Sequence, residues 1–413
     1  MTVERADVVV VGGGPAGLAA ATALRRRGVH SVVVLEREPE AGGIPRHCAH
    51  PGFGLRDLRR MYSGPGYARA WVRTAEQAGV DLRTSATVTG WTGERELSVT
   101  SPTGLAVVHA DAVVLATGCR ERPRPARLVP GDRPAGVLTT GQLQRLLQPS
   151  VPGAVGRRAV VVGAEHVSFS ALLSLAEAGV EVAALVTELP RHQTYAAFRT
   201  GARLRWHTPL LTSTRVSRIL GHGRVAAVEV ADVDSGATRT IPCDTVVFTG
   251  DWIPDSELTR RGGIDVDPAT KGPVVDSAQA TSAPGVFAAG NLVHPAEIAD
   301  VAALGGRAAA DGVCAWLAGT THGAPVRIQV AAPLAWITPQ RLVPGSPPPR
   351  FALRAAAVTG PGRLEVWQDG RLLASRRVLR LVPNRALHLG TGWTGAVRAS
   401  AGPPVVSFVS GRR

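Results

Sequence analysis

The sequence contains very little lysine and few aromatic residues. Lys271 is the only lysine among 46 basic residues, and aromatic residues make up 4% of the 413-residue chain. The formal net charge of +14 therefore comes from arginines, which are scattered along the chain. This scatter, with so few aromatic residues, does not favour a nucleic-acid surface. A compositional bias explains the charge best, with an acidic substrate or partner as the lesser alternative.

Cysteine is also scarce, and long apolar runs are missing. The four cysteines lie far apart and form no Cys-x-x-Cys pair, so we expect free thiols, no redox dithiol of that type and no metal site. No apolar run approaches the length of a membrane-spanning helix, and residues 1–7 lead directly into an apolar strand. We therefore expect no integral membrane segment, no signal peptide and a cytoplasmic protein.

A glycine-rich turn follows the first apolar strand. Four valines at residues 8–11 precede Gly12, Gly14 and Gly17, and the next apolar strand ends at Glu36. In a dinucleotide-binding turn the first glycine permits the tight bend, the second lets the backbone approach a pyrophosphate, and the third lets the helix pack closely. The helix N-terminus then faces the phosphates, and the acid binds a ribose. The pattern predicts a dinucleotide-binding unit.

The same pattern recurs from residue 159 with altered glycines. Sixteen residues separate Gly12 from Gly28, and sixteen separate Gly163 from Gly179, which indicates an internal repeat. In this register Glu165 takes the position of the second glycine, and a serine takes that of the third. A side chain and a negative charge then lie where a pyrophosphate would bind. We expect NAD(P) to bind poorly there.

One alternative for this second turn stays open. The position that matches Glu36 is Thr187, and Glu188 follows it directly. Glu188 could still hold a ribose if the loop has shifted. Ser168 replaces the third glycine in either case.

The rest of the chain predicts further elements around the two turns. A Gly/Pro-rich loop over residues 41–54 is a candidate functional loop. The chain then predicts, in order, a helix through 67–75, a buried strand over 112–118, a proline-rich crossing over 123–134, a strand over 245–254, a strand over 285–291, and a helix from about Ala296 to Leu317 with Pro295 in its first turn. Beyond a short linker near 320–324 the segments alternate, with Asp369–Gly370 as a hairpin turn.

These elements predict an α/β fold. It has two Rossmann-like FAD/NAD(P)-binding domains, the second inserted in the first, followed by a small all-β C-terminal domain. The predicted division is 1–122 and 256–320 for the FAD-binding domain, 123–255 for the NAD(P)-binding-like domain, and 325–413 for the β domain.

Several motifs together resemble the two-dinucleotide-domain flavoproteins, a superfamily that includes the pyridine nucleotide-disulfide oxidoreductases. They are residues 12–17 with Glu36, 116–118, 249–254 and 286–291. The resemblance covers about residues 5–318. Three further segments resemble an FAD-dependent subgroup without the redox cysteine pair, similar to the FAD-binding subunits of amine, opine and hydroxyproline dehydrogenases. They are 42–48, 54–55 and 64–68.

The resemblance implies that FAD lies extended across the first domain. The helix near residue 296 would aim its N-terminus at the flavin pyrimidine and favour the anionic reduced flavin. Asn291, in place of the usual aspartate, can bond a ribityl hydroxyl without charge. The implied cofactor-binding residues are Gly12, Gly14, Pro15, Ala16, Gly17, Glu36, Arg37, Gly43, Thr117, Gly118, Gly290, Asn291 and Ala296.

The catalytic candidates follow from the missing dithiol. Cys48 stands alone, which argues against disulfide reduction, and it is either a buried structural thiol or a reactive one. If the second site is closed, an organic substrate would deliver hydride to the flavin. Arg46 is then a candidate carboxylate clamp, and His47, His50 or His294 a candidate proton acceptor.

The favoured hypothesis is an FAD-dependent dehydrogenase, or its FAD-binding subunit. It would oxidise an amine, amino acid or hydroxy acid and pass electrons to a quinone, to oxygen or to a partner subunit. An NAD(P)H-dependent flavoprotein reductase is the second hypothesis. A flavin-carrying assembly subunit without turnover of its own is the third.

Overall fold

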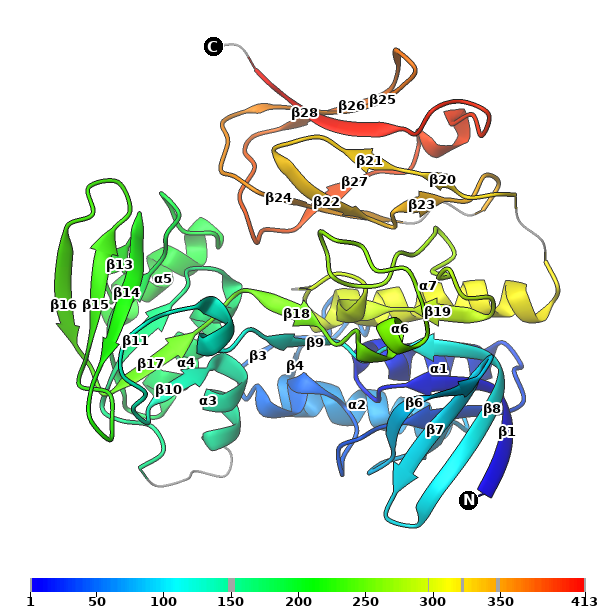
Figure 1. Cartoon of the computed structure of the whole chain (residues 1–413), viewed down its shortest axis with the longest axis horizontal. Helices are drawn as coiled ribbons and strands as arrows, with labels where there is room; N and C mark the ends of the chain where they lie inside the picture. Colours follow the sequence, from blue (N-terminus) through cyan, green and yellow to red (C-terminus); the bar gives the residue numbers. More distant parts are fainter. Residues whose placement is uncertain (1, 148–152, 296, 321–322, 347–349, 412–413) are drawn as a thin grey trace.

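The computed structural model describes residues 2–147, 153–295, 297–320, 323–346 and 350–411. Two units that combine sheets with helices lie side by side, and a unit made almost entirely of strands lies above them (Figure 1). This arrangement confirms the predicted α/β fold with a C-terminal β domain.

The first unit is built on a seven-stranded sheet. Its strands are β1 (Thr2–Val11), β2 (Val32–Leu35), β5 (Asp81–Arg83), β6 (Thr87–Gly93), β7 (Glu96–Ser101), β8 (Gly104–Leu115) and β19 (Val286–Ala288). The four valines at residues 8–11 of β1 are buried on both faces, as expected for the centre of a parallel sheet. β19 follows the second unit in the chain yet pairs with β8, so the second unit is inserted into the first.

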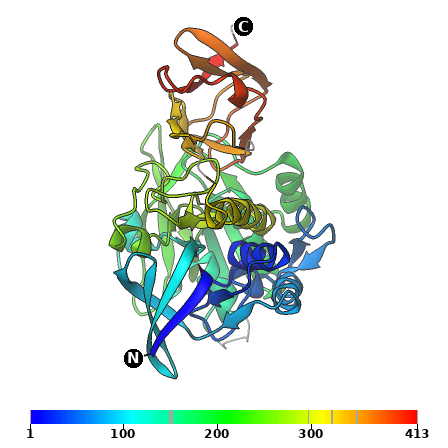
Figure 2. The same cartoon turned by 90° about the vertical axis from the view of Figure 1, so that its right-hand side faces the viewer.

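Three helices cover one face of this sheet. They are α1 (Pro15–Arg26), α2 (Gly64–Gln77) and α7 (Ala299–Leu317), and Figure 2 shows α7 directly beside α1. Gly306 of α7 permits this approach, because a Cβ there would lie 1.9 Å from the carbonyl oxygen of Ala16. The loop between β2 and α2 carries η1 (Ile44–His47), β3 (Pro51–Phe53) and β4 (Tyr62–Ser63).

The second unit repeats the plan of the first. Its parallel strands are β10 (Val137–Thr139), β11 (Arg158–Val162), β12 (Glu181–Val186), β13 (Leu210–Leu211) and β17 (Thr245–Phe248). An antiparallel sheet adds β14 (Thr214–Leu220), β15 (Ala227–Asp232) and β16 (Thr238–Pro242). Its helices are α3 (Thr140–Leu146), α4 (His166–Glu177) and α5 (Ala196–Trp206).

Two short antiparallel strands connect the units. They are β9 (Cys119–Glu121) and β18 (Trp252–Pro254), followed by η2 (Arg124–Arg127) and α6 (Glu257–Arg261) respectively. Both strands lie next to the divisions predicted near residues 122 and 255. The domain boundaries themselves stay a prediction, and residues 321–322 of the expected linker lie outside the described residues.

Helix α7 begins later than the sequence predicts. The predicted start near Ala296 is wrong, since the helix begins at Ala299 and Ile298 before it is extended. The preceding chain is held in a loop because the side chain of Asn291 bonds both the N–H and the carbonyl of Glu297 at 3.1 Å. Pro295 therefore precedes the helix instead of occupying its first turn.

The C-terminal unit packs two sheets around an apolar core. One sheet contains β21 (Gln329–Val330), β25 (Gly362–Gln368), β26 (Arg371–Val378) and β28 (Val405–Ser410), and the other contains β22 (Leu334–Thr338), β24 (Phe351–Ala355) and β27 (Leu387–Leu389). β20 (Val326–Arg327) pairs with β23 (Arg341–Leu342), and η4 (Thr394–Ala396) is the remaining short helix. The predicted hairpin turn at Asp369–Gly370 is confirmed.

Candidate functional site

Two glycines of the first turn are required by the fold itself. Gly12 has φ +110°, and a Cβ there would lie 2.5 Å from the carbonyl oxygen of Ala116. A Cβ at Gly17 would lie 1.9 Å from the carbonyl oxygen of Gly12. The chain therefore explains both glycines without a ligand.

Gly14 differs from these two. Its φ is −81°, and a Cβ there would meet only the Cα of Gly43, at 3.9 Å. It is the N-cap residue of α1, and no side chain caps this helix N-terminus. Open space at Gly14 therefore lies next to backbone N–H groups of α1 that no side chain caps. A bound pyrophosphate requires this arrangement.

The carboxylate of Glu36 lies against the same turn. It is buried, and its two oxygens accept hydrogen bonds from the N–H groups of Gly13 at 2.7 Å and Glu38 at 2.8 Å. Gly13 has little room, since a Cβ there would lie 3.0 Å from the Glu36 carboxylate. Gly13 is thus a functional glycine without a place in the motif, although the run of three glycines at 12–14 was a signal for it.

The second turn repeats the first with a constant offset of 151 residues. α1 spans Pro15–Arg26 and α4 spans His166–Glu177, so both helices begin and end at equivalent positions. Their N-cap residues are Gly14 and Glu165. The register predicted for the internal repeat is confirmed.

The side chain of Glu165 caps the N-terminus of α4. The side chain of Glu165 accepts a hydrogen bond from the backbone N–H of Ser168, and its buried Oε1 has no partner among the described residues. The hydroxyl of Ser168 in turn accepts a hydrogen bond from the Glu165 N–H at 3.2 Å. Burial raises the pKa of Glu165 despite these bonds. A carboxyl oxygen thus already lies where α1 offers open space.

A second segment of the chain, residues 192–194, lies against this turn, and we call the space between the two the groove of the second unit. Gly42 donates to the carbonyl of Gly13 at 2.8 Å in the first unit, and Gln193 donates to the carbonyl of Ala164 at 2.9 Å in the second, again 151 residues later. The segment 192–194 is buried. In the second unit, Gln193 and Thr194 take the positions of Gly42 and Gly43, so side chains occupy space that the two glycines leave open.

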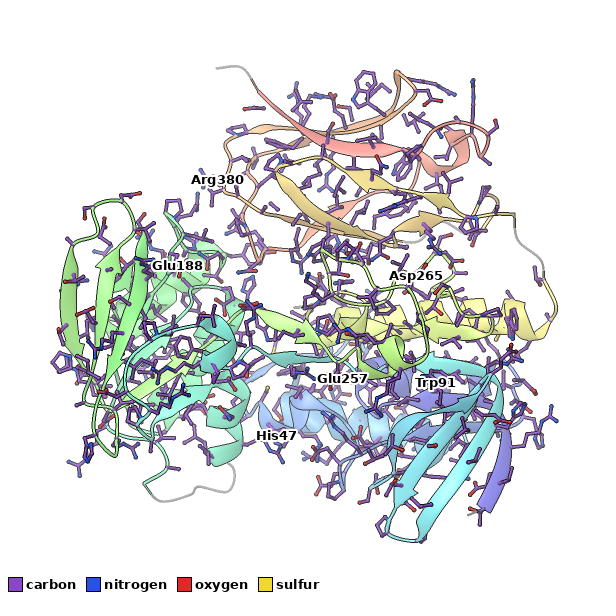
Figure 3. The ribbon with its side chains drawn as sticks, in the orientation of Figure 1. His47, Trp91, Glu188, Glu257, Asp265 and Arg380 are labelled. Carbon is purple, nitrogen blue, oxygen red and sulfur yellow. The ribbon has the colours of Figure 1, made fainter. Side chains whose placement is uncertain are left out.

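The side chains of this segment bond the nucleotide-facing positions. Gln193 donates to the Thr187 hydroxyl at 3.2 Å, which is the position equivalent to Glu36. The Thr194 hydroxyl lies 2.9 Å from Nδ1 of His166, the residue that follows the N-cap of α4. Glu188, the alternative ribose ligand, is exposed and lies at the upper side of the second unit (Figure 3). Sequence reasoning missed Gln193 and Thr194.

The predicted catalytic segment lies on η1, next to the second unit. Figure 3 shows His47 below β9 and β18, the two strands that connect the units. Burial and the neighbouring cations Arg46 and Arg145 lower the pKa of His47, so its imidazole is neutral at pH 7. Arg46 pairs with Glu40 at 3.3 Å, and its buried Nε has no partner among the described residues.

Cys48 is buried at the boundary between the two units. Its sulfur lies 3.4 Å from Oε1 of Gln144 on α3. Burial raises the pKa of the Cys48 thiol to about 12. It is therefore a thiol at neutral pH, which favours the structural interpretation over the reactive one.

His50 also connects the two units. Its Nε2 lies 2.7 Å from the hydroxyl of Ser170 on α4, and Gln144 donates to the same hydroxyl at 3.0 Å. Its ring stacks on Phe53 with centroids 5.4 Å apart. These contacts give His50 a clear role between the units.

His294 lies in a different environment. Its ring packs against Trp336 of the C-terminal unit, with centroids 5.2 Å apart. Burial lowers the pKa of His294 to about 4, and its buried Nδ1 has no partner among the described residues. His294 contacts the C-terminal unit, whereas Arg46 pairs with Glu40 and Cys48 contacts Gln144 on α3. None of these contacts is shared.

The remaining predicted cofactor residues lie around the first turn. Gly290 has φ +70°, and a Cβ there would lie 2.6 Å from the Cβ of Ala16, so this turn packs directly on the start of α1. Both polar groups of the Asn291 amide bond backbone groups of Glu297. Ala296 lies outside the described residues.

Asp255, which no sequence motif marked, contacts three of the predicted cofactor residues: Thr117, Gly118 and Arg37. The Thr117 hydroxyl donates to the carbonyl of Asp255 at 2.8 Å, and the Asp255 N–H donates to the carbonyl of Gly118 at 2.9 Å. Arg37 lies 3.4 Å from the Asp255 carboxylate, which also pairs with Arg120. Asp255 therefore joins the end of β18 to the first unit.

Comparison with known proteins agrees with this geometry. The family model of the pyridine nucleotide-disulphide oxidoreductases matches residues 6–306. An opine oxidase subunit from Agrobacterium tumefaciens is 29% identical over 74% of this chain and 64% of its own length. A ferredoxin–NADP reductase of Salinispora arenicola is 31% identical over 73% of this chain and 91% of its own length. The chain thus spans slightly less than two thirds of the opine oxidase protein.

Among solved structures, the thioredoxin reductase of T. acidophilum shares the fold. Its TM-score is 0.65 at 24% identity, over 77% of this chain and 100% of its own. Among the described residues, the helices are too short or too polar to cross a bilayer. From the matched family model, the open turn at Gly14 and the shared fold, this chain belongs to the pyridine nucleotide-disulphide oxidoreductase family and is an FAD-dependent oxidoreductase.

Proposed function

We propose that this protein is a dehydrogenase, or the FAD-binding subunit of one, in which a small organic substrate reduces the flavin in place of NAD(P)H. The substrate class is an amine, an amino acid or a hydroxy acid. The likeness to the opine oxidase protein supports this class, and the filled groove of the second unit is the observation that carries the proposal.

The first unit supplies the residues that would hold FAD. Gly14 leaves space beside the uncapped N-terminus of α1, so the pyrophosphate would bind there. Glu36 would accept hydrogen bonds from a ribose on the lone pairs that its bonds to the N–H groups of Gly13 and Glu38 leave free. The turn at Gly290 packs on Ala16 and would approach the chain that carries the flavin. Bound FAD supplies a two-electron acceptor for a hydride.

The second unit lacks the equivalent space. A nucleotide pyrophosphate would have to displace the carboxyl group of Glu165, and a ribose at Thr187 would have to displace Gln193. Losing these bonds leaves buried groups unpaired, which costs about 1–3 kcal/mol for each group. The accumulated cost opposes NAD(P)H binding.

The loop at η1 would orient the substrate. Arg46 presents a guanidinium whose Nε lacks a partner among the described residues, and this suits a substrate carboxylate. His47 is neutral at pH 7 and can accept a proton from a substrate amine or hydroxyl. Cys48 supports the loop from its buried position. A quinone, oxygen or a partner protein would then accept the electrons.

Anaerobic titration of the FAD-loaded protein tests the proposal. NADH and NADPH are added separately while the flavin absorbance is followed, and then amino acids, opines and hydroxy acids are added in the same way. We expect slow or no bleaching by the pyridine nucleotides and rapid bleaching by one organic class. Rapid stoichiometric bleaching by NADH or NADPH would overturn the proposal.

An NAD(P)H-dependent reductase is the second candidate. The likeness to the ferredoxin–NADP reductase, which extends over 91% of that protein, favours it. The exposed Glu188 is then the residue to test as a ribose ligand. Glu188→Gln would weaken NADPH binding at least tenfold under this alternative and leave it unchanged under the first proposal.

A further inference from the structure

A buried ion pair joins the C-terminal unit to the loop before α7. Arg354 on β24 lies 2.7 Å from the carboxylate of Glu297, and the two side chains are 6% and 5% exposed. β22 and β24 lie on the side of the C-terminal unit that faces α7 (Figure 1). The guanidinium of Arg354 also lies over the ring of Trp336, 5.2 Å from its centroid.

Glu297 in turn bonds the turn at Gly290, which the proposed function places beside FAD. Its N–H and carbonyl both bond the side chain of Asn291, and Gly290 beside it packs on Ala16 at the start of α1. Three contacts therefore connect Arg354 to the start of α1: Arg354 with Glu297, Glu297 with Asn291, and Gly290 with Ala16. The pairing of Trp336 with His294 adds a parallel contact to the same loop.

The charge state of this pair follows from its surroundings. Burial by itself raises the pKa of Glu297. The attraction of Arg354, together with His294, outweighs burial, so the net shift of this pKa is downward. Glu297 is then an anion held by Arg354 at neutral pH. Buried ion pairs gain little net stability because desolvation offsets their attraction. We therefore explain this ion pair by the position and the charge that it gives to the Glu297 side chain, and not by a gain in folding stability.

Attachment of the C-terminal unit does not require the pair. Gln340 accepts a hydrogen bond from Val275 at 3.0 Å, and Val343 donates to Ser277 at 3.0 Å. Arg341 also pairs with Asp265 at 2.8 Å, in a contact that is 31% and 52% exposed. Figure 3 shows Asp265 between the C-terminal unit and the first unit.

We propose that Arg354 is a positioning residue of the flavin site. It holds Glu297, and through Glu297 the side chain of Asn291, so that the C-terminal unit sets the charge and the contacts next to the N-terminal end of α7. The flavin site is complete only when this β unit is docked. FAD binding by the first unit is the only function on which the proposal rests.

The test measures FAD affinity and the flavin midpoint potential of purified variants. Arg354→Met leaves an unpaired carboxylate at the loop, so FAD affinity falls at least tenfold and the potential shifts downward, because a negative charge disfavours the reduced flavin. Glu297→Gln leaves an unpaired guanidinium and shifts the potential upward. Arg354→Lys keeps the charge but loses the planar guanidinium that lies over Trp336, so the midpoint potential stays near the original while FAD affinity recovers only in part.

Arg341→Met is the matched control, since it removes an arginine from another contact of the same unit. It is expected to leave both quantities unchanged. Opposite shifts for Arg354→Met and Glu297→Gln support the proposal, because a merely structural contact would move both variants in the same direction. If Arg354→Met does not fold, an upward shift of the potential in Glu297→Gln with an unchanged potential in Arg354→Lys carries the test. Shifts of the same sign in Arg354→Met and Glu297→Gln, or an unchanged potential in Glu297→Gln, overturn the proposal.

Discussion

At the residue scale, Gly14 and Gly17 are glycines for different reasons. Gly14→Ala is expected to fold with an unchanged melting temperature and to lose at least tenfold in FAD affinity, because its methyl group would enter the space open to the pyrophosphate. Gly17→Ala is expected to lose about 1–3 kcal/mol of unfolding free energy, since its Cβ would overlap the carbonyl of Gly12. Thermal unfolding and FAD titration separate the two effects. Equal melting temperatures for both variants would contradict this distinction.

The thiol of Cys48 is expected to be inert. Its pKa is raised to about 12 by burial, so iodoacetamide at pH 8 should leave it unlabelled until the protein unfolds. Mass spectrometry of the labelled protein gives the result. Cys314, which is only partly buried, is the internal comparison, and its labelling should come first. Rapid labelling of Cys48 in the native protein would restore the reactive interpretation.

His47 predicts the acid limb of the pH profile. Its pKa is lowered below 6.5, mainly by burial, so a base at this position works above that pKa and fails as the pH falls through it. The rate of flavin reduction by substrate should therefore decline as the pH falls through this lowered pKa in the original protein. His47→Gln should reduce the rate about 100-fold and remove this limb. Stopped-flow reduction across pH 5–8 measures both, and an unchanged limb in the variant would exclude His47 as the base.

The sequence predicted the residues of the glycine turns better than those of the groove. Gly12, Gly14, Gly17 and Glu36 carry a local motif, and the structure places them around one turn. Gln193 carries no motif, because its contact with Ala164 depends on a loop returning to the turn. Extending the offset of 151 residues to the loop would have identified it. Buried pKa shifts depend on neighbours that the sequence does not bring together.

At the element scale, helix α4 carries a carboxyl group where α1 carries none. The pKa of Glu165 is raised by burial in the folded protein, so its contribution to stability is greatest at low pH and is lost as the pH rises through the folded value. Glu165→Gln removes the titrating group and keeps the shape of the side chain. Relative to this variant, the original protein should therefore lose stability as the pH rises from 5 to 8.

Melting curves of both proteins from pH 5 to pH 8 give this difference directly. Glu181 on β12, whose side chain is 64% exposed, provides the control substitution Glu181→Gln. That control should follow the original protein at every pH. A difference between Glu165→Gln and the original that stays constant with pH would show that Glu165 does not titrate in this range.

Helix α7 shows what limits prediction of an element. The proline at 295 suited a first helical turn and a start near residue 296, yet the helix begins at Ala299. The cause is the Asn291 side chain, which bonds the backbone of Glu297 and keeps the chain in a loop. Such a contact between a side chain and a distant backbone group leaves no periodic signal in the sequence.

At the scale of the whole molecule, the C-terminal unit contacts both other units. Arg385 donates to the carbonyls of Gln193, at 3.3 Å, and Thr194, and its guanidinium lies over the ring of Tyr195. Arg385→Ala is expected to lose about 1–3 kcal/mol of local stability. Hydrogen exchange of residues 191–195 should rise about tenfold or more.

The control for this prediction is Arg380→Ala, on the same unit (Figure 3). It should leave hydrogen exchange in residues 191–195 unchanged. Protection that persists in Arg385→Ala would show that the segment is held by Thr187 and Ala164 alone.

The filled groove of the second unit has a consequence for regulation. A unit that carries its own Glu165 carboxyl group and Gln193 amide in place of a nucleotide has no exchangeable ligand at that position. If the proposed function holds, turnover would then not respond to the cellular ratio of reduced to oxidised pyridine nucleotide. Oxidation of the substrate could continue when the NADH pool is already full, with its rate set by the electron acceptor.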